Sequence, residues 1–109
     1  MDFDTYQNES RKTALYPNVG DNFIYPTLGL CGEAGEVAEK IKKILRDNNN
    51  IADEERKNEI KKELGDVLWY LTQVATELNL SLDDIAKTNI DKLQERLKHN
   101  RIHGNGDNR

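Results

Sequence analysis

The chain has 109 residues, of which 36% are apolar and 33% are charged, and its formal net charge is −4. This length fits one domain, and the acidic balance without a basic, aromatic-bearing stripe argues against binding to nucleic acid. A single cysteine excludes an internal disulfide, and no signal-peptide pattern or apolar stretch of about 18 residues occurs. We therefore expect a cytoplasmic protein with no membrane partner.

Helical periodicity divides the chain into four elements. The first helix begins near Asp2 or Asp4 and ends before Pro17, and the last begins at Ser81, which has an acid three residues later as in a capping box. Because few residues are apolar, a single subunit would have a thin core. We therefore expect the burial of apolar side chains to be completed in a homo-oligomer. The first three expected helices span residues 3–15, 27–46 and 54–79; the domain spans residues 1–98 and a flexible tail spans residues 99–109.

Two copies of one pattern lie on the second and third helices. Each copy has two carboxylates three residues apart and a glycine just before the second, and 26 residues separate the copies. Positions i and i+3 share a helical face, and both pairs have the same phase relative to the apolar positions. The four acidic residues are Glu33, Glu36, Glu63 and Asp66.

These carboxylates predict a metal site. Crowded carboxylates resist ionisation unless a cation lies among them, and oxygen-only ligands favour Mg²⁺ or Mn²⁺. One such pair alone is typical of a solvated helix face, whereas two pairs with matched phase and matched glycines favour the metal. Because Mg²⁺ takes its remaining contacts from water and substrate phosphates, the expected chemistry is phosphoryl transfer to a water, with one carboxylate accepting its proton.

Other positions are expected to serve packing. Gly35 and Gly65 each cost about 0.5–1 kcal/mol inside a helix, which a close helix or ligand would offset. Trp69 falls opposite the apolar arc and is a candidate for a subunit interface. Cys31 is expected in the core, and Asn89 falls inside the apolar arc of the last helix, where an unpaired amide would cost roughly 1–3 kcal/mol.

Basic and polar side chains near the acidic pairs are candidates for substrate binding, although lysines on helices are usually surface residues. Lys92 is well placed because Asn89 precedes it on the same face, and Tyr70 follows Asp66 by one turn. The candidate substrate-binding residues are Lys40, Lys43, Tyr70, Asn89, Lys92 and Arg96.

The residues carry a resemblance to a known family. The chain resembles the MazG-like nucleoside triphosphate pyrophosphohydrolases, in which E-x-x-E is followed, after a spacer, by E-x-x-D. The resemblance covers about residues 3–98. It is carried by the segments 28–39, 63–70 and 89–93.

This resemblance implies an all-α, four-helix bundle completed by oligomerisation to a dimer or tetramer. It also implies Mg²⁺-dependent hydrolysis of a nucleoside or deoxynucleoside triphosphate between the α- and β-phosphates. The four carboxylates would hold the metal, and Tyr70, Asn89 and Lys92 would lie near the nucleotide. The residues that recognise the base vary within the family, and the aromatic candidates here are Tyr16, Phe23 and Tyr25.

Two alternatives remain open from the sequence. One is a dUTPase-like hydrolase of the same fold, which a panel of substrates would distinguish. The other is a non-catalytic helical interaction protein whose acidic stripes are only solvated faces; it would show no saturation with divalent ions. A di-iron carboxylate bundle is disfavoured because its Glu-x-x-His pairs are missing.

Overall fold

The computed structural model describes residues 1–100 and 102–108. These residues form four helices and no strand. The all-α expectation is therefore confirmed. Except at the end of the first helix, the expected boundaries lie within one turn of the observed ones. The helices are α1 (Phe3–Arg11), α2 (Ile24–Asp47), α3 (Glu54–Glu77) and α4 (Leu82–Lys98).

Side-chain caps begin three of the four helices. The carboxylate of Asp2 accepts a hydrogen bond from the backbone N–H of Thr5, Asp53 accepts from Arg56, and the Ser81 hydroxyl accepts from Asp84. Each cap satisfies a backbone donor that has no partner inside its helix. The Ser81 cap expected from the sequence is therefore confirmed.

The first helix is shorter than expected. It ends at Arg11 rather than at residue 15, and the Thr13 hydroxyl then donates to the carbonyl oxygen of Ser10 over 2.6 Å. After this turn, the Arg11 guanidinium donates a 2.8 Å hydrogen bond to the hydroxyl of Tyr16, five residues later. The helix therefore ends well before Pro17, and the segment after it continues in short turns.

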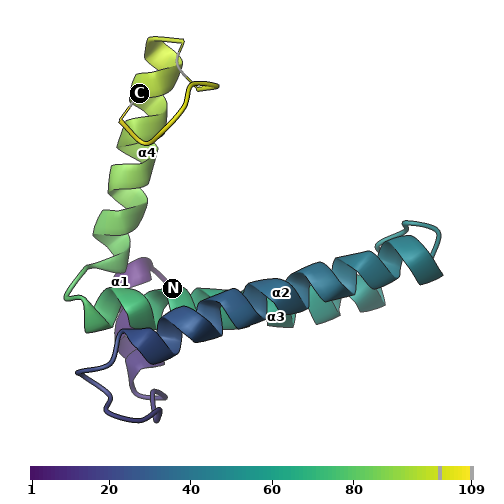
Figure 1. The fold of residues 1–109 in the computed structure, drawn as a ribbon, viewed down its shortest axis with the longest axis horizontal. Coiled ribbons are helices and arrows are strands. Elements are labelled where there is room, and N and C mark those ends of the chain that lie inside the picture. The colour runs from purple at the N-terminus through teal and green to yellow at the C-terminus, as the bar shows by residue number, and fades with distance from the viewer. Residues whose placement is uncertain (101, 109) are drawn as a thin grey trace.

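The four helices form an open, L-shaped molecule (Figure 1). α2 and α3 run side by side as an antiparallel hairpin, α1 packs across the base of this hairpin, and α4 rises from the same corner. Within the described part of the chain, the helix pairs that pack substantially are α2 with α3, α1 with α3 and α1 with α4. The radius of gyration is 16.7 Å, whereas a compact chain of this length has roughly 13 Å.

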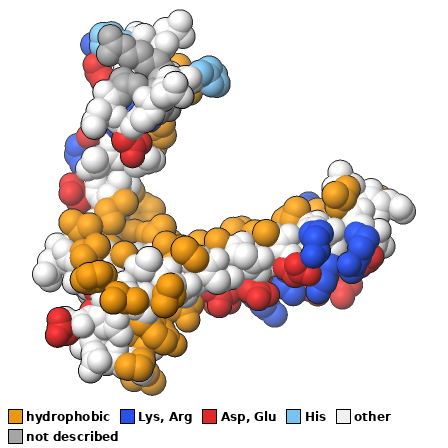
Figure 2. All heavy atoms as spheres, in the orientation of Figure 1, with side chains coloured by type: hydrophobic (Ala, Val, Ile, Leu, Met, Phe, Trp, Pro, Cys, Tyr) orange, Lys and Arg blue, Asp and Glu red, His pale blue; other side chains and the backbone are white. Residues whose placement is uncertain are grey.

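The core is thin, as the composition predicts. Large apolar side chains lie exposed along α2, along α4 and at the corner (Figure 2). Two polar side chains of α3, Thr72 and Gln73, are fully buried, and the Gln73 amide donates to the Ser10 hydroxyl of α1 over 3.1 Å. The buried apolar residues are Ala14, Tyr16, Ile44, Ala75 and Leu82.

Candidate metal centre

The α2–α3 hairpin brings three of the four predicted acidic residues together. Glu33 on α2 and Glu63 and Asp66 on α3 each offer a carboxylate oxygen, and these oxygens lie within 4.8 Å of one another. Glu33 is half-buried because its side of α2 faces α3, whereas Asp66 is exposed. Glu36 lies one turn further along α2, is exposed, and falls outside this close group. Glu33, Glu63 and Asp66 are called the acidic group below.

The acidic group carries unrelieved negative charge. The pKa of Glu33 is raised, first by burial and then by the charge of Asp66, the hydrogen bond and charge of Glu63, and the charge of Glu36. Among the salt bridges between described residues, none involves these four carboxylates. Oxygen-only donors that repel one another fit a hard divalent cation, so the chemistry of this group suits Mg²⁺ or Mn²⁺.

Tyr70 lies beside the acidic group and packs on a glycine. A Cβ atom added to Gly29 would overlap the Tyr70 ring. The pKa of Tyr70 is raised by burial, then by Tyr25 and by the charges of Glu33 and Asp66. Gly29 precedes Glu33 by one turn and Tyr70 follows Asp66 by one turn, so an antiparallel hairpin sets them opposite each other. That spacing is the sequence signal for this contact.

Gly35 and Gly65 do not make the close approach expected of them. A Cβ atom at either position would meet nothing within 4 Å in the described structure. The glycine on which a neighbouring element packs closely is Gly29 instead. No neighbouring helix of the described structure therefore offsets their cost to helix stability, and a ligand at these positions stays a prediction.

An aromatic cluster extends from Tyr70 toward α1. Tyr16 stacks on Tyr25 with ring centroids 5.2 Å apart, and Trp69 meets both Tyr16 and Tyr70 edge-on at 6.3 and 5.0 Å. The indole N–H of Trp69 also donates to the Thr13 hydroxyl over 2.8 Å. Trp69 thus packs against residues of its own chain, and its place at a subunit interface stays a prediction.

A buried carboxylate, Glu77, anchors the segment that leads into α2. Its side chain is fully buried and accepts hydrogen bonds from Arg11, from the Tyr16 hydroxyl and from the backbone N–H groups of Gly20 and Asn22. Burial alone would raise the pKa of Glu77, but these donors outweigh it and lower the pKa to about 2. The role of Glu77 could not be predicted from the sequence, because two of its donors are backbone groups.

The predicted lysines of α2 lie further along the hairpin than the acidic group. Lys40 pairs with Glu59 of α3 at 3.9 Å, and Lys43 pairs with Glu39 at 3.9 Å. Both lysines line a pocket of about 220 Å³ near the tip of the hairpin. The other residues that line this pocket are Ile44, Asp47, Arg56, Glu59 and Ile60.

The predicted residues of α4 are not brought to the acidic group within one subunit. α4 rises away from the hairpin (Figure 1), and Lys92 and Arg96 contact the Asp107 carboxylate of the tail at 3.1 and 3.5 Å. Asn89 is exposed, which corrects the expectation that it is buried and paired.

Two further expectations concern Cys31 and the tail. Cys31 is exposed rather than buried in the core. Described tail residues fold back on α4, where the Asp107 carbonyl accepts a 2.6 Å hydrogen bond from Arg96. Whether the tail is flexible stays a prediction, and two of its positions, 101 and 109, lie outside the described residues.

Comparison with known proteins adds an independent observation. The family described as MazG nucleotide pyrophosphohydrolase domain matches residues 26–101, which include both acidic pairs. The chain is also 44% identical, over the full length of both chains, to a protein named Gene 37 protein from Mycobacterium phage L5. No solved structure matches the chain. In the part of the chain that is described, no helix is long and apolar enough to cross a membrane.

Proposed function

The chain belongs to the MazG nucleotide pyrophosphohydrolase family, and we propose that it is a Mg²⁺-dependent enzyme acting on nucleoside or deoxynucleoside triphosphates. It cleaves between the α- and β-phosphates and releases the monophosphate and pyrophosphate. The observation that carries this proposal is the acidic group, in which three carboxylates from two helices converge without a cationic partner in the described structure.

The metal would be held by Glu33, Glu63 and Asp66. When bound, Mg²⁺ supplies positive charge that neutralises phosphate oxygens and makes a coordinated water more acidic. Glu36 lies one turn from Glu33 and outside the close group, so its carboxylate is available to accept the proton of the attacking water. The fixed positions of these side chains on two packed helices favour catalysis because little reorganisation is needed.

The other proposed substrate contacts follow from where side chains lie relative to the acidic group. Tyr70, held on Gly29, borders the acidic group and can hydrogen-bond the nucleotide. Exposed faces of Phe23 and Tyr25 at the start of α2 offer stacking surface for a base. Lys40 makes only a long, half-exposed ion pair with Glu59, so its ammonium group can turn to a phosphate instead.

A panel of natural and modified triphosphates with Mg²⁺ tests the proposal, with monophosphate and pyrophosphate as the measured products. We expect turnover that saturates with Mg²⁺ and disappears on chelation. The panel also separates a dUTPase-like preference from a broader one. A non-catalytic interaction protein would release no pyrophosphate from any member of the panel.

Two substitutions test whether hydrolysis depends on the predicted carboxylates. Asp66→Asn and Glu36→Gln should each abolish hydrolysis while circular dichroism shows unchanged helix content. Glu55→Gln is the matched control, because Glu55 is an exposed carboxylate of the same helix that lies outside the acidic group. Equal turnover in the wild type and both test variants would defeat the proposal.

A further inference from the structure

The buried carboxylate of Glu77 holds the segment 16–22, which leads into α2. One of its oxygens accepts hydrogen bonds from the Tyr16 hydroxyl over 2.7 Å and from the Gly20 N–H over 2.9 Å. The other oxygen accepts from the backbone N–H of Asn22 over 2.7 Å. The side chain of Glu77 has no exposed surface, so a bound nucleotide could not reach it. Any effect of Glu77 on a substrate therefore passes through the groups that it holds.

Two of these groups act on Tyr25, in the first turn of α2. The Tyr16 ring stacks on the Tyr25 ring with the centroids 5.2 Å apart and the planes 15° from parallel. The side-chain oxygen of Asn22 accepts a 3.0 Å hydrogen bond from the backbone N–H of Tyr25. The Asn22 amide also donates to the Pro17 carbonyl over 2.8 Å, which closes the segment on itself. Glu77 thus fixes Tyr25 both at its ring and at its backbone.

Tyr25 connects this segment with the acidic group. Tyr16 covers one face of the Tyr25 ring, and 43% of the Tyr25 surface is exposed. The pKa of Tyr70, which borders the acidic group, is raised by burial, then by Tyr25 and by the charge of Glu33, so these side chains lie near one another. A nucleotide whose phosphates meet a metal at the acidic group could therefore stack its base on Tyr25.

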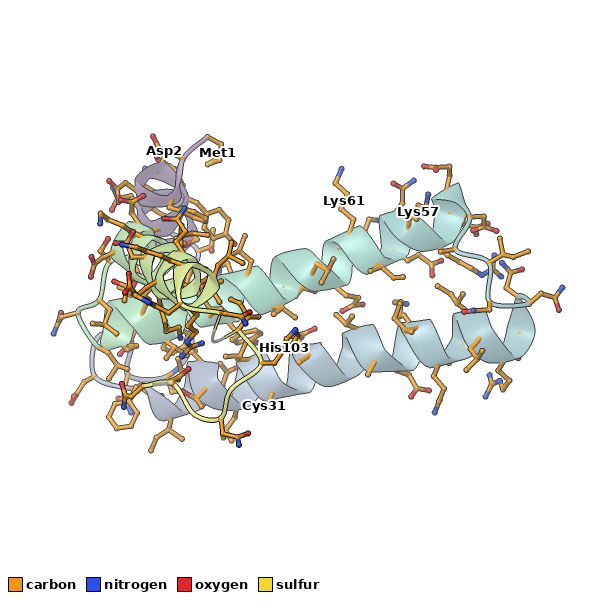
Figure 3. All side chains as sticks on the ribbon, turned by 90° about the horizontal axis from the view of Figure 1, so that it is seen from above. Met1, Asp2, Cys31, Lys57, Lys61 and His103 are labelled. Atoms are coloured by element: carbon orange, nitrogen blue, oxygen red, sulfur yellow. The ribbon has the colours of Figure 1, made fainter. Side chains whose placement is uncertain are left out.

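The two ends of α3 provide a natural comparison, because Glu54 is its first residue and Glu77 its last. Glu77 bonds Arg11 of α1, at the end of the hairpin where α1 packs. Seen from above, Asp2, which precedes α1, lies at this end, whereas Lys57 lies near the other end (Figure 3). Glu54 makes an exposed ion pair with Lys57 at 3.5 Å. Each carboxylate therefore has a basic partner, but only that of Glu77 holds the segment beside Tyr25.

We propose that Glu77 is a positioning residue for nucleotide binding, which fixes, through Tyr16 and Asn22, the Tyr25 ring on which the base stacks. This inference rests on the proposed function and adds a residue that does not touch the substrate. A buried charge is costly to leave unpaired, so its donors keep the segment in one arrangement before the nucleotide binds. A ring that is already held in place loses little freedom on binding, which favours affinity for the base.

The test measures KM and kcat separately, with the nucleoside triphosphate that the wild type hydrolyses fastest. We expect Glu77→Gln to raise KM about tenfold, because base stacking is weakened, and to change kcat by less than about twofold. A general loss of folded protein would instead lower kcat at unchanged KM, because it only removes active molecules. Glu54→Gln is the matched control: it also removes a carboxylate with a basic partner from α3, and KM should stay unchanged.

Two further variants keep the test decisive if Glu77→Gln folds poorly. Tyr16→Phe keeps the ring but removes its 2.7 Å hydrogen bond to Glu77, and it should raise KM about threefold. In a Tyr25→Ala background, Tyr16→Phe should have no further effect on KM, because the stacking surface is already gone.

A binding measurement supports the kinetics without catalysis. Trp69 is the single tryptophan of the chain and meets Tyr16 edge-on, so its fluorescence should report binding of a non-hydrolysable α,β-methylene triphosphate. The dissociation constant of this analogue should rise in Tyr16→Phe and in Glu77→Gln by the same factors as KM.

An unchanged KM in both Glu77→Gln and Tyr16→Phe would overturn the proposal. So would an effect of Tyr16→Phe that is equally large with and without the Tyr25 ring. Both results leave hydrolysis by the wild type intact, which distinguishes them from a failure of the proposed function. A wild type that releases no pyrophosphate would overturn the proposed function and this inference together.

Discussion

Helix α3 carries carboxylates in two opposite situations. Near its end, Glu77 is buried and receives hydrogen bonds from two side chains and two backbone N–H groups. Near its middle, Glu63 and Asp66 meet Glu33, and no basic side chain among the described residues pairs with any of them. The pKa of Glu77 is accordingly lowered, while that of Glu33 is raised.

This difference distinguishes a carboxylate that stabilises the fold from carboxylates that can bind a ligand. A carboxylate that the chain surrounds with donors stabilises the fold, because its charged form is favoured in the folded state. A group of carboxylates that the chain leaves without donors destabilises the fold, and a ligand from outside can offset that cost. Sequence position alone does not distinguish them, since Glu77, Glu63 and Asp66 all lie on the same side of α3.

The largest expected effect comes from neutralising the satisfied carboxylate. Glu77→Gln should lower the free energy of unfolding by about 3 kcal/mol, because the amide cannot replace the charge that holds Arg11 and the backbone donors. Urea unfolding at pH 7 measures this loss. A change of less than about 0.5 kcal/mol would show that the anchor contributes little to stability.

Acid should act next most strongly, and through the same residue. The folded pKa of Glu77 is about 2, below the unfolded value, so its contribution is complete above about pH 4.5 and is lost as the pH falls toward 2. We expect a loss of about 2 kcal/mol on going from pH 7 to pH 3 from this group alone.

The acidic group should respond in the opposite direction. Because the folded pKa of Glu33 is raised, its protonation removes repulsion, and stability should increase slightly as the pH falls through that raised value. As the pH is lowered from 7 in small steps, the free energy of unfolding should therefore rise slightly before it falls. In Glu77→Gln the rise should remain and much of the fall should disappear.

Adding Mg²⁺ should stabilise the wild type by about 1.4 kcal/mol at ten times its dissociation constant, because only the folded state presents the acidic group. Thermal unfolding with and without a chelator measures this shift. Glu63→Gln should lose most of it and Glu77→Gln should keep it. Equal shifts in the two variants would place the cation elsewhere.

The smallest effect is expected for Glu63→Gln without metal. Removing one of the three charges relieves repulsion on Glu33, so the free energy of unfolding should rise by less than about 1 kcal/mol. Urea unfolding with a chelator present tests the sign. A loss as large as that of Glu77→Gln would mean that Glu63 is a structural residue.

The sequence predicted the helices and the convergence of two acidic turns, since both follow from periodicity and phase. It did not predict which flank of a helix is covered. Cys31 was assigned to the core because it is small and apolar, but its side chain is exposed in the described structure. Asn89 was likewise predicted to be buried, because it falls inside the apolar arc of α4, but it is exposed.

The anchor at Glu77 also lay beyond sequence reasoning. Its partners Gly20 and Asn22 contribute backbone N–H groups, which leave no side-chain signature. The last residue of α1 belongs to the same network, because Arg11 and Tyr16 both donate hydrogen bonds to Glu77. Contacts between positions far apart in the chain therefore set these local features.

The contact between Gly29 and Tyr70 has a consequence for sequence change. A methyl group at position 29 has no space while the tyrosine ring lies over it, so a larger residue there requires the ring to move away or a smaller residue at position 70. The two positions are therefore coupled by packing, although 40 residues separate them. Among natural relatives, we expect a larger residue at position 29 to occur together with a change at position 70.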